Sequence, residues 1–353
     1  MQIMEVLKRA VQTGASDLFL VSGCPLSAKV NGEIAYFSQE KLDSGVAQGL
    51  ISEIYEIAHR DQLGRLMQTG DDDFSFSVNG LGRFRCNAYK QRGSLAAVLR
   101  VVSFELPDPA QMHIPDQVID LYQKKKGLVL ITGPAGSGKS TTLACMIDKI
   151  NKTCNYHVIT IEDPIEYIHS HKKSIVSQRE VSNDTADYAN ALRAALRQSP
   201  NVILLGEMRD FETIQTALTA AETGQLVLST LHTVGAANTI DRIIDVFPAN
   251  QQQQIRVQLS MVLQAVVSQH LIPTLDGGLI PAFEVMTANS AIRNMIRESK
   301  IHQLDNAIYA GAAQGMVTMD ASILRLYQQG RISRENALMY ASNPEVLAKR
   351  MTP

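Results

Sequence analysis

The segment Gly133–Ser140, which reads GPAGSGKS, constrains the fold of this chain more than any other stretch of its sequence. It matches the pattern GxxxxGK[ST] in full, follows the apolar run GLVLIT and precedes a helical pattern. Glycines in such a turn let backbone N–H groups converge on phosphate oxygens, and the helix N-terminus adds a partial positive charge. A glycine-rich turn without function is the alternative, but the strand–turn–helix context favours a P-loop in an α/β sheet.

The P-loop pattern also predicts which side chains hold a nucleotide. We expect Lys139 to reach the β- and γ-phosphates of ATP and Ser140 to ligate Mg²⁺, so ATP and Mg²⁺ are the expected cofactors. The residues predicted to contact the nucleotide in this segment are Gly133, Gly136, Ser137, Gly138, Lys139, Ser140 and Thr141.

Short apolar runs alternate with helical patterns from residue 127 to residue 246. Apolar strands separated by helices indicate a parallel sheet that helices cover on both faces. From Gln251 onward the pattern is mainly helical, which predicts a helical C-terminal region. The expected strands are 127–132, 158–161, 202–205 and 226–229; the expected helices are 139–150, 186–198, 211–223, 236–246, 255–270, 290–300, 320–329 and 333–340.

Residues 1–107 predict a small α/β domain that precedes a larger one of residues 108–353. The two prolines of Leu106–Pro109 break regular structure, so this stretch is the best candidate for a linker. The expected elements of the small domain are a helix at 2–13 and strands at 17–22, 74–78, 83–92 and 96–102, with a turn at Asn79-Gly80.

Carboxylates follow two of the predicted strands of the larger domain. Glu207 comes after the strand at 202–205, where a P-loop protein needs a carboxylate to order the waters of its magnesium ion. The run ITIEDPIE places Glu162, Asp163 and Glu166 close together, where they repel one another unless a cation or hydrogen-bond donors hold them. We expect one of the three to activate the attacking water. A surface glutamate and a solvated acidic turn are the respective alternatives.

The apolar strand in LSTLHT ends just before His232, at the edge where open α/β sheets bind their ligands. We expect His232 to sense or polarise the γ-phosphate, whereas a hydrogen-bonded core histidine is the alternative. In the small domain, Arg85 lies on the polar face of an alternating strand, and Arg100 lies on the next strand. These arginines have three interpretations. They form a solvated strand face, they act as arginine fingers on ATP held by another domain, or they belong to a nucleic-acid-binding patch.

The composition narrows the classes of function that fit. Lys and Arg number 33 against 35 Asp and Glu, a net charge of −2, and the chain has no Trp. A near-neutral chain has no overall field that draws it to nucleic acid or to an anionic membrane. No apolar run approaches the roughly 18 residues of a membrane span, so we expect a cytoplasmic protein that reaches a membrane only through a partner. Four scattered cysteines without CxxC spacing predict reduced, buried thiols.

Taken together, these motifs resemble those of the secretion ATPase superfamily, in which GPAGSGKST, ITIEDPIE, VILLGEMRD and LSTLHT occur in the same order. ASDLFL, RFRCNAY, SQREV, ALRAALRQSP and AIRNMIRE make the chain similar to the type IV pilus retraction ATPases of that superfamily along essentially its whole length. Assembly and secretion members usually carry an extra N-terminal domain and a four-cysteine zinc module; from the length of this sequence and the absence of a CxxC pair, we expect neither here.

The resemblance implies a fold, an activity and partners. It implies a PAS-like N-terminal domain, a RecA-like core and a homohexameric, Mg²⁺-dependent ATPase whose chemistry drives pilus retraction and twitching motility. It implies an inner-membrane pilus platform protein as partner, other pilus motor ATPases as further partners, no direct contact with nucleic acid, and a place at the inner face of the cytoplasmic membrane. A nucleic-acid translocase, a nucleotide-gated regulator and a small-molecule kinase are the rival functions.

The resemblance also implies residue roles. Glu166 matches the catalytic glutamate, Glu207 the Walker B glutamate and His232 the second histidine of the His box. Arg85 and Arg100 match arginines that approach ATP held by a C-terminal domain. Arg193 and Arg197 match a further basic pair near the nucleotide.

Two positions depart from the family pattern. The His box usually opens with Gly-His-Leu, but here it reads Gly224-Gln225-Leu226, which removes a group that can be protonated. Met295 stands in AIRNMIRE where Leu is usual, a mild change of similar volume.

Ile292 and Ile296 are four residues apart, so AIRNMIRE predicts one helix whose arginine row is free to couple motion. A buried amphipathic helix is the alternative.

Overall fold

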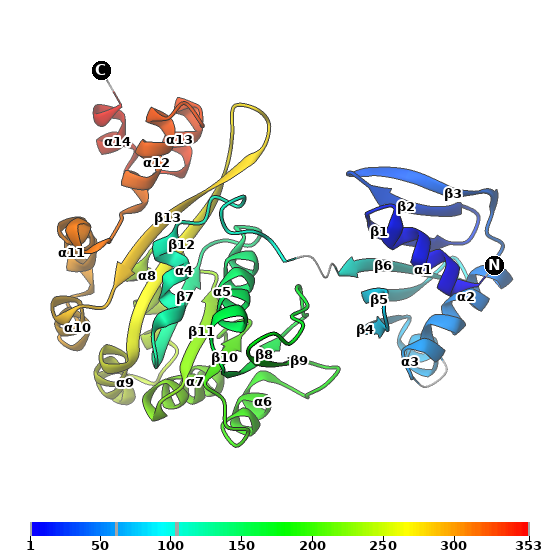
Figure 1. The fold of residues 1–353 in the computed structure, drawn as a ribbon, viewed down its shortest axis with the longest axis horizontal. Helices are drawn as coiled ribbons and strands as arrows, with labels where there is room; N and C mark the ends of the chain where they lie inside the picture. The colour runs from blue at the N-terminus through cyan, green and yellow to red at the C-terminus, as the bar shows by residue number, and fades with distance from the viewer. Residues whose placement is uncertain (1, 61–62, 103–105, 352–353) are drawn as a thin grey trace. The chain divides into compact units, whose positions relative to one another are not determined.

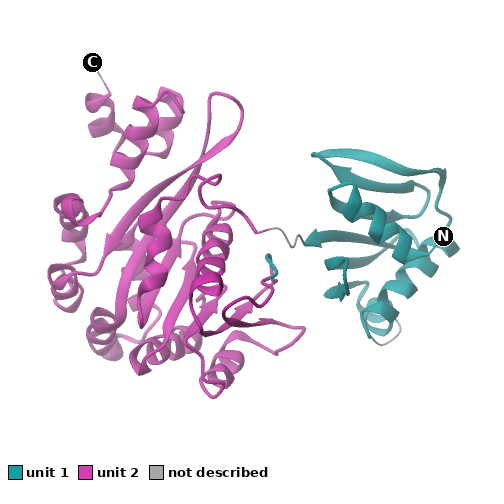
Figure 2. Ribbon diagram, in the orientation of Figure 1, with its two compact units in different colours: residues 1–105, 166–168 teal, residues 106–165, 169–353 magenta. Residues whose placement is uncertain are grey.

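The computed structural model describes residues 2–60, 63–102 and 106–351. It divides into two compact units, residues 1–105 with 166–168 and residues 106–165 with 169–353 (Figure 2). Each unit has its own sheet (Figure 1).

The first unit is built on a six-stranded antiparallel sheet in the order β3-β2-β1-β6-β5-β4. Helices α1 and α2 share one hydrophobic core with alternate residues of the strands, among them Phe84, Cys86 and Leu99. Because side chains alternate along a strand, Arg85 between Phe84 and Cys86 points to the opposite face. The elements are α1 (Ile3–Gln12), β1 (Ala15–Val21), β2 (Pro25–Val30), β3 (Glu33–Lys41), α2 (Ser44–Ile57), α3 (Gly64–Thr69), β4 (Asp71–Val78), β5 (Gly82–Gln91) and β6 (Ser94–Val102).

The hairpin predicted around Asn79-Gly80 is present in this unit. Strand β4 pairs with β5 from Asp71↔Tyr89 to Val78↔Gly82, and Gly80 has a positive φ of 73° that the tight turn requires. Between residues 23 and 70, where no element is predicted, the structure has β2, β3, α2 and α3. The two strands are not predicted because neither shows a clear alternation of buried and exposed residues.

The second unit contains a seven-stranded sheet in the order β13-β12-β7-β11-β10-β8-β9. Every neighbouring pair is parallel except β12 and β13. The predicted α/β architecture with a parallel sheet is therefore confirmed. The strands are β7 (Gly127–Thr132), β8 (His157–Glu162), β9 (Ile175–Glu180), β10 (Val202–Leu205), β11 (Leu226–Leu231), β12 (Leu263–Pro273) and β13 (Leu279–Thr287).

Helices cover both faces of this sheet. Residues of α4 and α5 pack with Val129 and Ile131 on one face. Residues of α6, α7, α8, α9 and α10 pack with Leu128 and Leu130 on the other. The helices before the C-terminal region are α4 (Asp116–Ile119), α5 (Lys139–Thr153), α6 (Tyr188–Ala195), α7 (Phe211–Thr223), α8 (Ala236–Asp245) and α9 (Ala249–Val262).

One predicted helix is wrong over its second half. Residues 255–270 were expected to be helical, but α9 ends at Val262 and the chain continues as strand β12 from Leu263. Strand β12 lies between β7 and β13 and is buried on both faces, so its sequence shows no alternation that separates a strand from a buried helix. The adjacent β-branched residues Val266 and Val267 favour the strand once neighbours are available.

Strand β13 is a second strand that the mainly helical pattern of this region did not predict, and the chain after β13 is mainly helical, as predicted. Its helices are α10 (Ser290–Arg297), α11 (Leu304–Ala310), α12 (Met319–Gln328), α13 (Arg334–Tyr340) and α14 (Pro344–Arg350). No helix in the described part of the chain is long and apolar enough to cross a membrane. All four cysteines are free thiols; Cys86 and Cys145 are buried as predicted, whereas Cys24 and Cys154 are only partly buried.

Candidate active site

The P-loop joins the carboxyl end of β7 to the first turn of α5. Gly133 has a φ of 139°, and a Cβ atom there would lie 2.2 Å from the carbonyl oxygen of Gln269, so only glycine fits. The Lys139 Nζ donates to the carbonyl oxygens of Gly133 at 2.9 Å and Pro134 at 2.8 Å. Its ammonium group therefore lies inside the turn that would also hold the phosphates. Ser140 and Thr141 follow it in the first turn of α5.

The wall behind the P-loop comes from β12, which the sequence analysis did not identify. Ser268 of β12 pairs with Thr132, the last residue of β7. The Gln269 side chain is buried, and its Oε1 accepts a 2.8 Å hydrogen bond from the Thr142 hydroxyl of α5. A Cβ atom on Gly138 would lie 2.9 Å from Gln269 Nε2. Gln269 therefore supports both ends of the P-loop, although no motif in the sequence marks it.

Glu207 and His232 meet at the carboxyl ends of the neighbouring strands β10 and β11. The Glu207 carboxylate is 8% exposed, and its Oε2 lies 2.5 Å from Arg209 Nε and 3.5 Å from His232 Nε2. Because β7, β11 and β10 are adjacent and parallel, their carboxyl ends form one edge with the P-loop. The sequence predicted Lys139 from the P-loop pattern, and Glu207 and His232 from the ends of their strands.

The donor set at this edge fits a magnesium ion. No cluster of three or more His, Cys, Asp or Glu side chains suited to a metal occurs among the described residues. Magnesium in P-loop proteins needs no such cluster, because phosphates, waters, one hydroxyl and one carboxylate complete its octahedral shell. Ser140 offers the hydroxyl and Glu207 the carboxylate. The nearby Ser137 hydroxyl is buried and has no protein partner among the described residues, so it is available to a polar ligand.

The acidic residues after β8 separate into bound and exposed groups. Glu162, the last residue of β8, accepts hydrogen bonds from the Thr160 hydroxyl at 2.6 Å and from Gln178 Nε2 at 3.3 Å. Glu166 is exposed in the loop that follows. The Ile165 N–H beside it donates to Glu180 Oε2 at 3.0 Å, which fixes this loop against β9. Local bonds therefore occupy Glu162, whereas Asp163 and Glu166 are both exposed.

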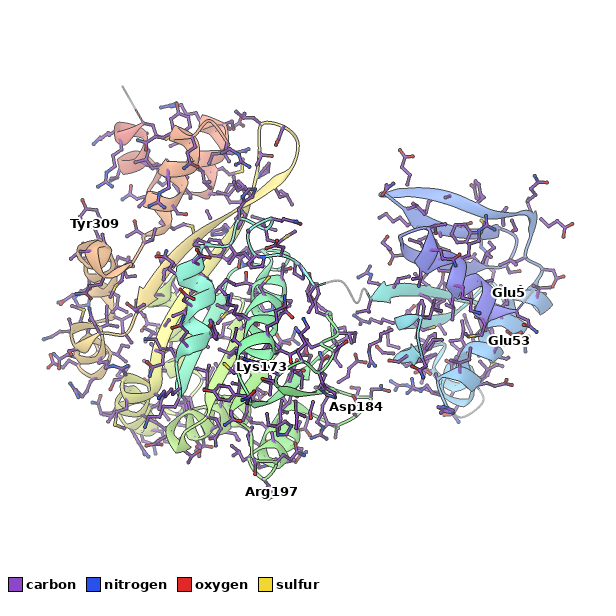
Figure 3. The ribbon with its side chains drawn as sticks, viewed as in Figure 1. Glu5, Glu53, Lys173, Asp184, Arg197 and Tyr309 are labelled. Atoms are coloured by element: carbon purple, nitrogen blue, oxygen red, sulfur yellow. The ribbon has the colours of Figure 1, made fainter. Side chains whose placement is uncertain are left out.

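Arg193 lies on α6, and Arg197 lies just beyond the end of this helix. Arg193 forms an ion pair with Glu212 in the first turn of α7 and donates to Asn190 Oδ1 at 2.9 Å. Arg197 precedes Gln198, whose carbonyl oxygen bonds the ring of His157, the first residue of β8. Figure 3 shows Arg197 at the far end of the unit, pointing outward. Within one chain, the structure does not bring Arg197 to the carboxyl edge.

Arg85 and Arg100 lie side by side on the open face of the first unit. Arg85 of β5 pairs with Arg100 of β6, which pairs with Asp17 of β1, so the three side chains form one row across the sheet. Arg100 Nε donates to Asp17 Oδ1 at 3.0 Å. The row borders a hollow of about 200 Å³ that Asp73 also lines. The sequence predicted Arg85 on the polar face of its strand and Arg100 on the next strand, but it did not predict that the two are neighbours or that two carboxylates lie beside them.

The departure at Gln225 falls at the opposite edge of the sheet. Gln225 precedes β11, and its carbonyl oxygen accepts from the N–H of Gly127, the first residue of β7. Its side-chain Oε1 accepts from the Thr223 hydroxyl at 2.9 Å. His232 follows the carboxyl end of the same strand, so the two positions of the His box lie one strand length apart.

Helix α10 carries the segment AIRNMIRE. Its two arginines form hydrogen bonds within the chain, contrary to the prediction that they are free. Ile292 and Ile296 are fully buried, which confirms the amphipathic helix. Arg293 Nη1 donates to the carbonyl oxygens of Ser260 at 2.6 Å and Met261 at 2.9 Å, so it satisfies the C-terminal end of α9. Arg297 donates to Asn294 Oδ1 at 3.0 Å on the same helix. Arg293 is thus an anchor between two helices.

Comparisons with known proteins cover nearly the whole chain. The family model for type II/IV secretion system proteins matches residues 1–342. The type IV pilus retractation ATPase PilT of Pseudomonas aeruginosa is 46% identical over 98% of this chain and 99% of that protein. The type IV pilus ATPase PilU of the same organism is 38% identical over 97% of this chain and 89% of that protein. The crystal structure of the pilus retraction motor PilT with bound ADP has a TM-score of 0.89 at 48% identity and 99% coverage of both chains.

Proposed function

The chain belongs to the family of type II/IV secretion system proteins, and from this premise we propose that it is an ATP-hydrolysing motor that powers type IV pilus retraction and twitching motility. The observation that carries the proposal is the edge at which the P-loop, Glu207 and His232 meet. Whole-length similarity to a pilus retraction ATPase then selects the motor among the possible P-loop proteins. ATP hydrolysis is the activity that this edge supports.

The residues of the P-loop bind and orient the phosphates. Backbone N–H groups between Gly133 and Ser140 surround the phosphate oxygens, and Lys139 exchanges its two carbonyl contacts for the β- and γ-phosphates. Mg²⁺, when bound, neutralises charge that develops on the transferred phosphoryl group. Ser140 would hold the ion directly, and Glu207 would hold its waters.

Glu166 is the proposed general base, and His232 the proposed sensor of the γ-phosphate. An exposed carboxylate on a pinned loop can accept a proton from a water without losing a structural hydrogen bond, whereas Glu162 would lose two. His232 is half exposed and 3.5 Å from Glu207, so its position depends on the charge state of that edge.

Arg85 and Arg100 suit a site that is completed by two units. The first unit has no P-loop, so ATP near these arginines must be bound by the second unit of the same or a neighbouring chain. We propose that the neighbouring chain binds it, in a homohexamer at the inner face of the cytoplasmic membrane. The platform protein of the pilus, and other pilus motor ATPases, are the proposed partners. Asp17 would hold Arg100 in place until the nucleotide arrives.

Mixed assemblies test the shared site directly. Arg85→Ala and Lys139→Ala subunits are each expected to be inactive, because one lacks the arginine and the other the phosphate contact. When the two variants are mixed, ATPase activity should reappear, since some interfaces combine an intact P-loop with an intact Arg85 from the neighbour. No recovery, together with a specific activity that stays constant on dilution to monomer, would show a self-sufficient subunit. Lys8→Ala is the matched control, because this exposed cation lies on helix α1.

A deletion strain tests the direction of force. Cells without the protein should be hyperpiliated and should not retract their pili. Bald cells would instead indicate an assembly motor.

A further inference from the structure

Glu284 is a buried carboxylate that the proposed mechanism does not use. It lies on β13, is 7% exposed and pairs across the strands with Ser268 of β12. A buried carboxylate is costly unless donors satisfy it, so its hydrogen-bond partners show what it holds in place.

Glu284 and Ser268 together hold the turn that follows His232. The Gly235 N–H donates to Ser268 Oγ at 3.0 Å, and the next N–H, that of Ala236, donates to Glu284 Oε1 at 2.8 Å. These are the last residue before α8 and the first residue of α8. Gly235 has a φ of 84°, so the turn adopts a conformation that glycine favours and that the two bonds maintain.

The same carboxylate also lies near the C-terminal helices. Glu284 lines one cavity together with Thr318 and Met319, at the start of α12. Glu284 therefore accepts a hydrogen bond from the first residue of α8 and lies near the first residue of α12, and the dipoles of both helices favour a negative charge there. Burial raises the pKa of the Glu284 carboxyl, as do Asp305 and Asp320, while the Ala236 N–H opposes this shift.

We propose that Glu284 is a positioning residue for His232, which links the nucleotide edge to the C-terminal helices through α8 and α12. The inference rests on the proposed role of His232 as the γ-phosphate sensor. His232 is four residues before Ala236, so a displacement of His232 acts on the turn that Glu284 and Ser268 hold. Helix α12 packs with β12, β13, α13 and α14 in a separate core, which would receive this displacement.

A double-mutant cycle with ATPase turnover as the readout tests the link. We expect Glu284→Ala to lower kcat about tenfold while the KM for ATP changes less than about twofold, because Gln269 still supports the P-loop. Glu284→Gln should stay within about threefold of the wild type, since its amide oxygen still accepts an N–H. His232→Ala should be slow alone, and adding Glu284→Ala should cost little more, because both changes remove the same function.

Ser322→Ala is the matched control. The Ser322 hydroxyl of α12 accepts from the N–H of Phe283, next to Glu284, at 3.1 Å. Its removal loosens α12 from β13 without touching the turn after His232, so kcat should remain close to that of the wild type. If this variant lowers kcat as much as Glu284→Ala does, general loosening explains the effect and the inference is wrong.

The remaining outcomes separate the inference from the proposed function. If the losses in kcat of the two single variants multiply in the double variant, the inference is wrong. It is also wrong if Glu284→Ala keeps the wild-type kcat while His232→Ala is slow. Neither result affects the proposed function. A fast His232→Ala would remove the sensor role and the inference with it. If Glu284→Ala does not fold, as thermal unfolding would show, Ser268→Ala replaces it in the cycle, with the same non-additive result expected.

Discussion

The two edges of the seven-stranded sheet both carry polar residues from motifs of this chain. At one edge the side chains contact residues of other strands and helices, whereas at the other edge the contact is local. At the carboxyl edge, Glu207 contacts His232 across two strands, and Gln269 of β12 bonds Thr142 of α5. At the amino edge, Gln225 bonds Thr223 two residues away. A motif residue therefore gains a place in the site only when strand direction brings it to the edge where parallel strands end.

The loop of residues 163–174 connects these two edges. It leaves the carboxyl end of β8 with Glu166 and returns to the amino end of β9, where Asn151 of α5 bonds it. The Asn151 side chain donates to the Ser170 carbonyl oxygen at 2.7 Å and accepts from the Lys172 N–H at 3.0 Å. The proposed base thus lies at one end of a loop that the opposite end of α5 fixes.

The largest effect should come from the part of this loop that lies at the carboxyl edge of the sheet. We expect Glu166→Gln to lower ATP turnover by about 100-fold or more, because an amide cannot take the proton of the attacking water. ATP binding should stay nearly intact, since the P-loop is unchanged. Turnover at saturating ATP and binding of a fluorescent nucleotide measure the two separately. Asp163→Asn is the control in the same exposed turn, and if it alone stops turnover, the base is Asp163.

A smaller effect is expected from the middle of the loop when the pH falls. Burial lowers the pKa of His169 to about 4, with Asp148 raising it and Lys172 lowering it in smaller measure. The unfolded chain binds this proton below a pH of about 6.5, so the folded state loses stability from pH 6.5 down to pH 4, by up to about 3 kcal/mol. Urea unfolding at pH 7 and pH 5 measures this loss.

His169→Gln should flatten that pH dependence, whereas His302→Gln, which removes an exposed histidine of the same unit, should leave it unchanged. Equal pH dependence in the wild type and in His169→Gln would show that other groups cause it.

The wall of the P-loop should give a moderate effect. Gln269→Ala removes the partner of Thr142 behind the loop, and we expect the KM for ATP to rise about three- to tenfold and stability to fall by about 1–2 kcal/mol. Thr142→Ala should match it, and the double variant should be little worse than either single one. Steady-state kinetics and urea unfolding of the three variants provide the measurement. Independent losses would mean that this hydrogen bond does not support the loop.

The smallest effect is expected at the amino edge. Gln225→His restores the residue that is usual in the family, and we expect kcat and KM to change less than about twofold, because the side chain lies a strand length from His232. A large gain in turnover from Gln225→His would show that the amino edge takes part in the chemistry, and the contrast between the edges would fail.

The site could be predicted from the sequence as far as local patterns reach. The P-loop was predicted because its function depends on consecutive residues, and Glu207 and His232 were predicted because each lies within two residues of the end of an apolar strand. Ser268, Gln269 and Glu284 were not predicted, because they lie on strands whose apolar runs are also compatible with a buried helix. The bonds of Arg293 to α9 were missed for a related reason, since a cation on a helix surface does not reveal which carbonyl oxygens lie near it.

By itself the sequence determined that this chain forms a P-loop α/β sheet with a nucleotide edge, since glycine conformations, strand ends and helix starts are local properties. Only the tertiary structure decided that β12 lies beside β7, that Glu284 accepts a bond from the first residue of α8, and that Asp17 pairs with Arg100. These contacts join residues that are far apart in the chain. Their partners depend on strand order and register, which packing of the whole unit selects.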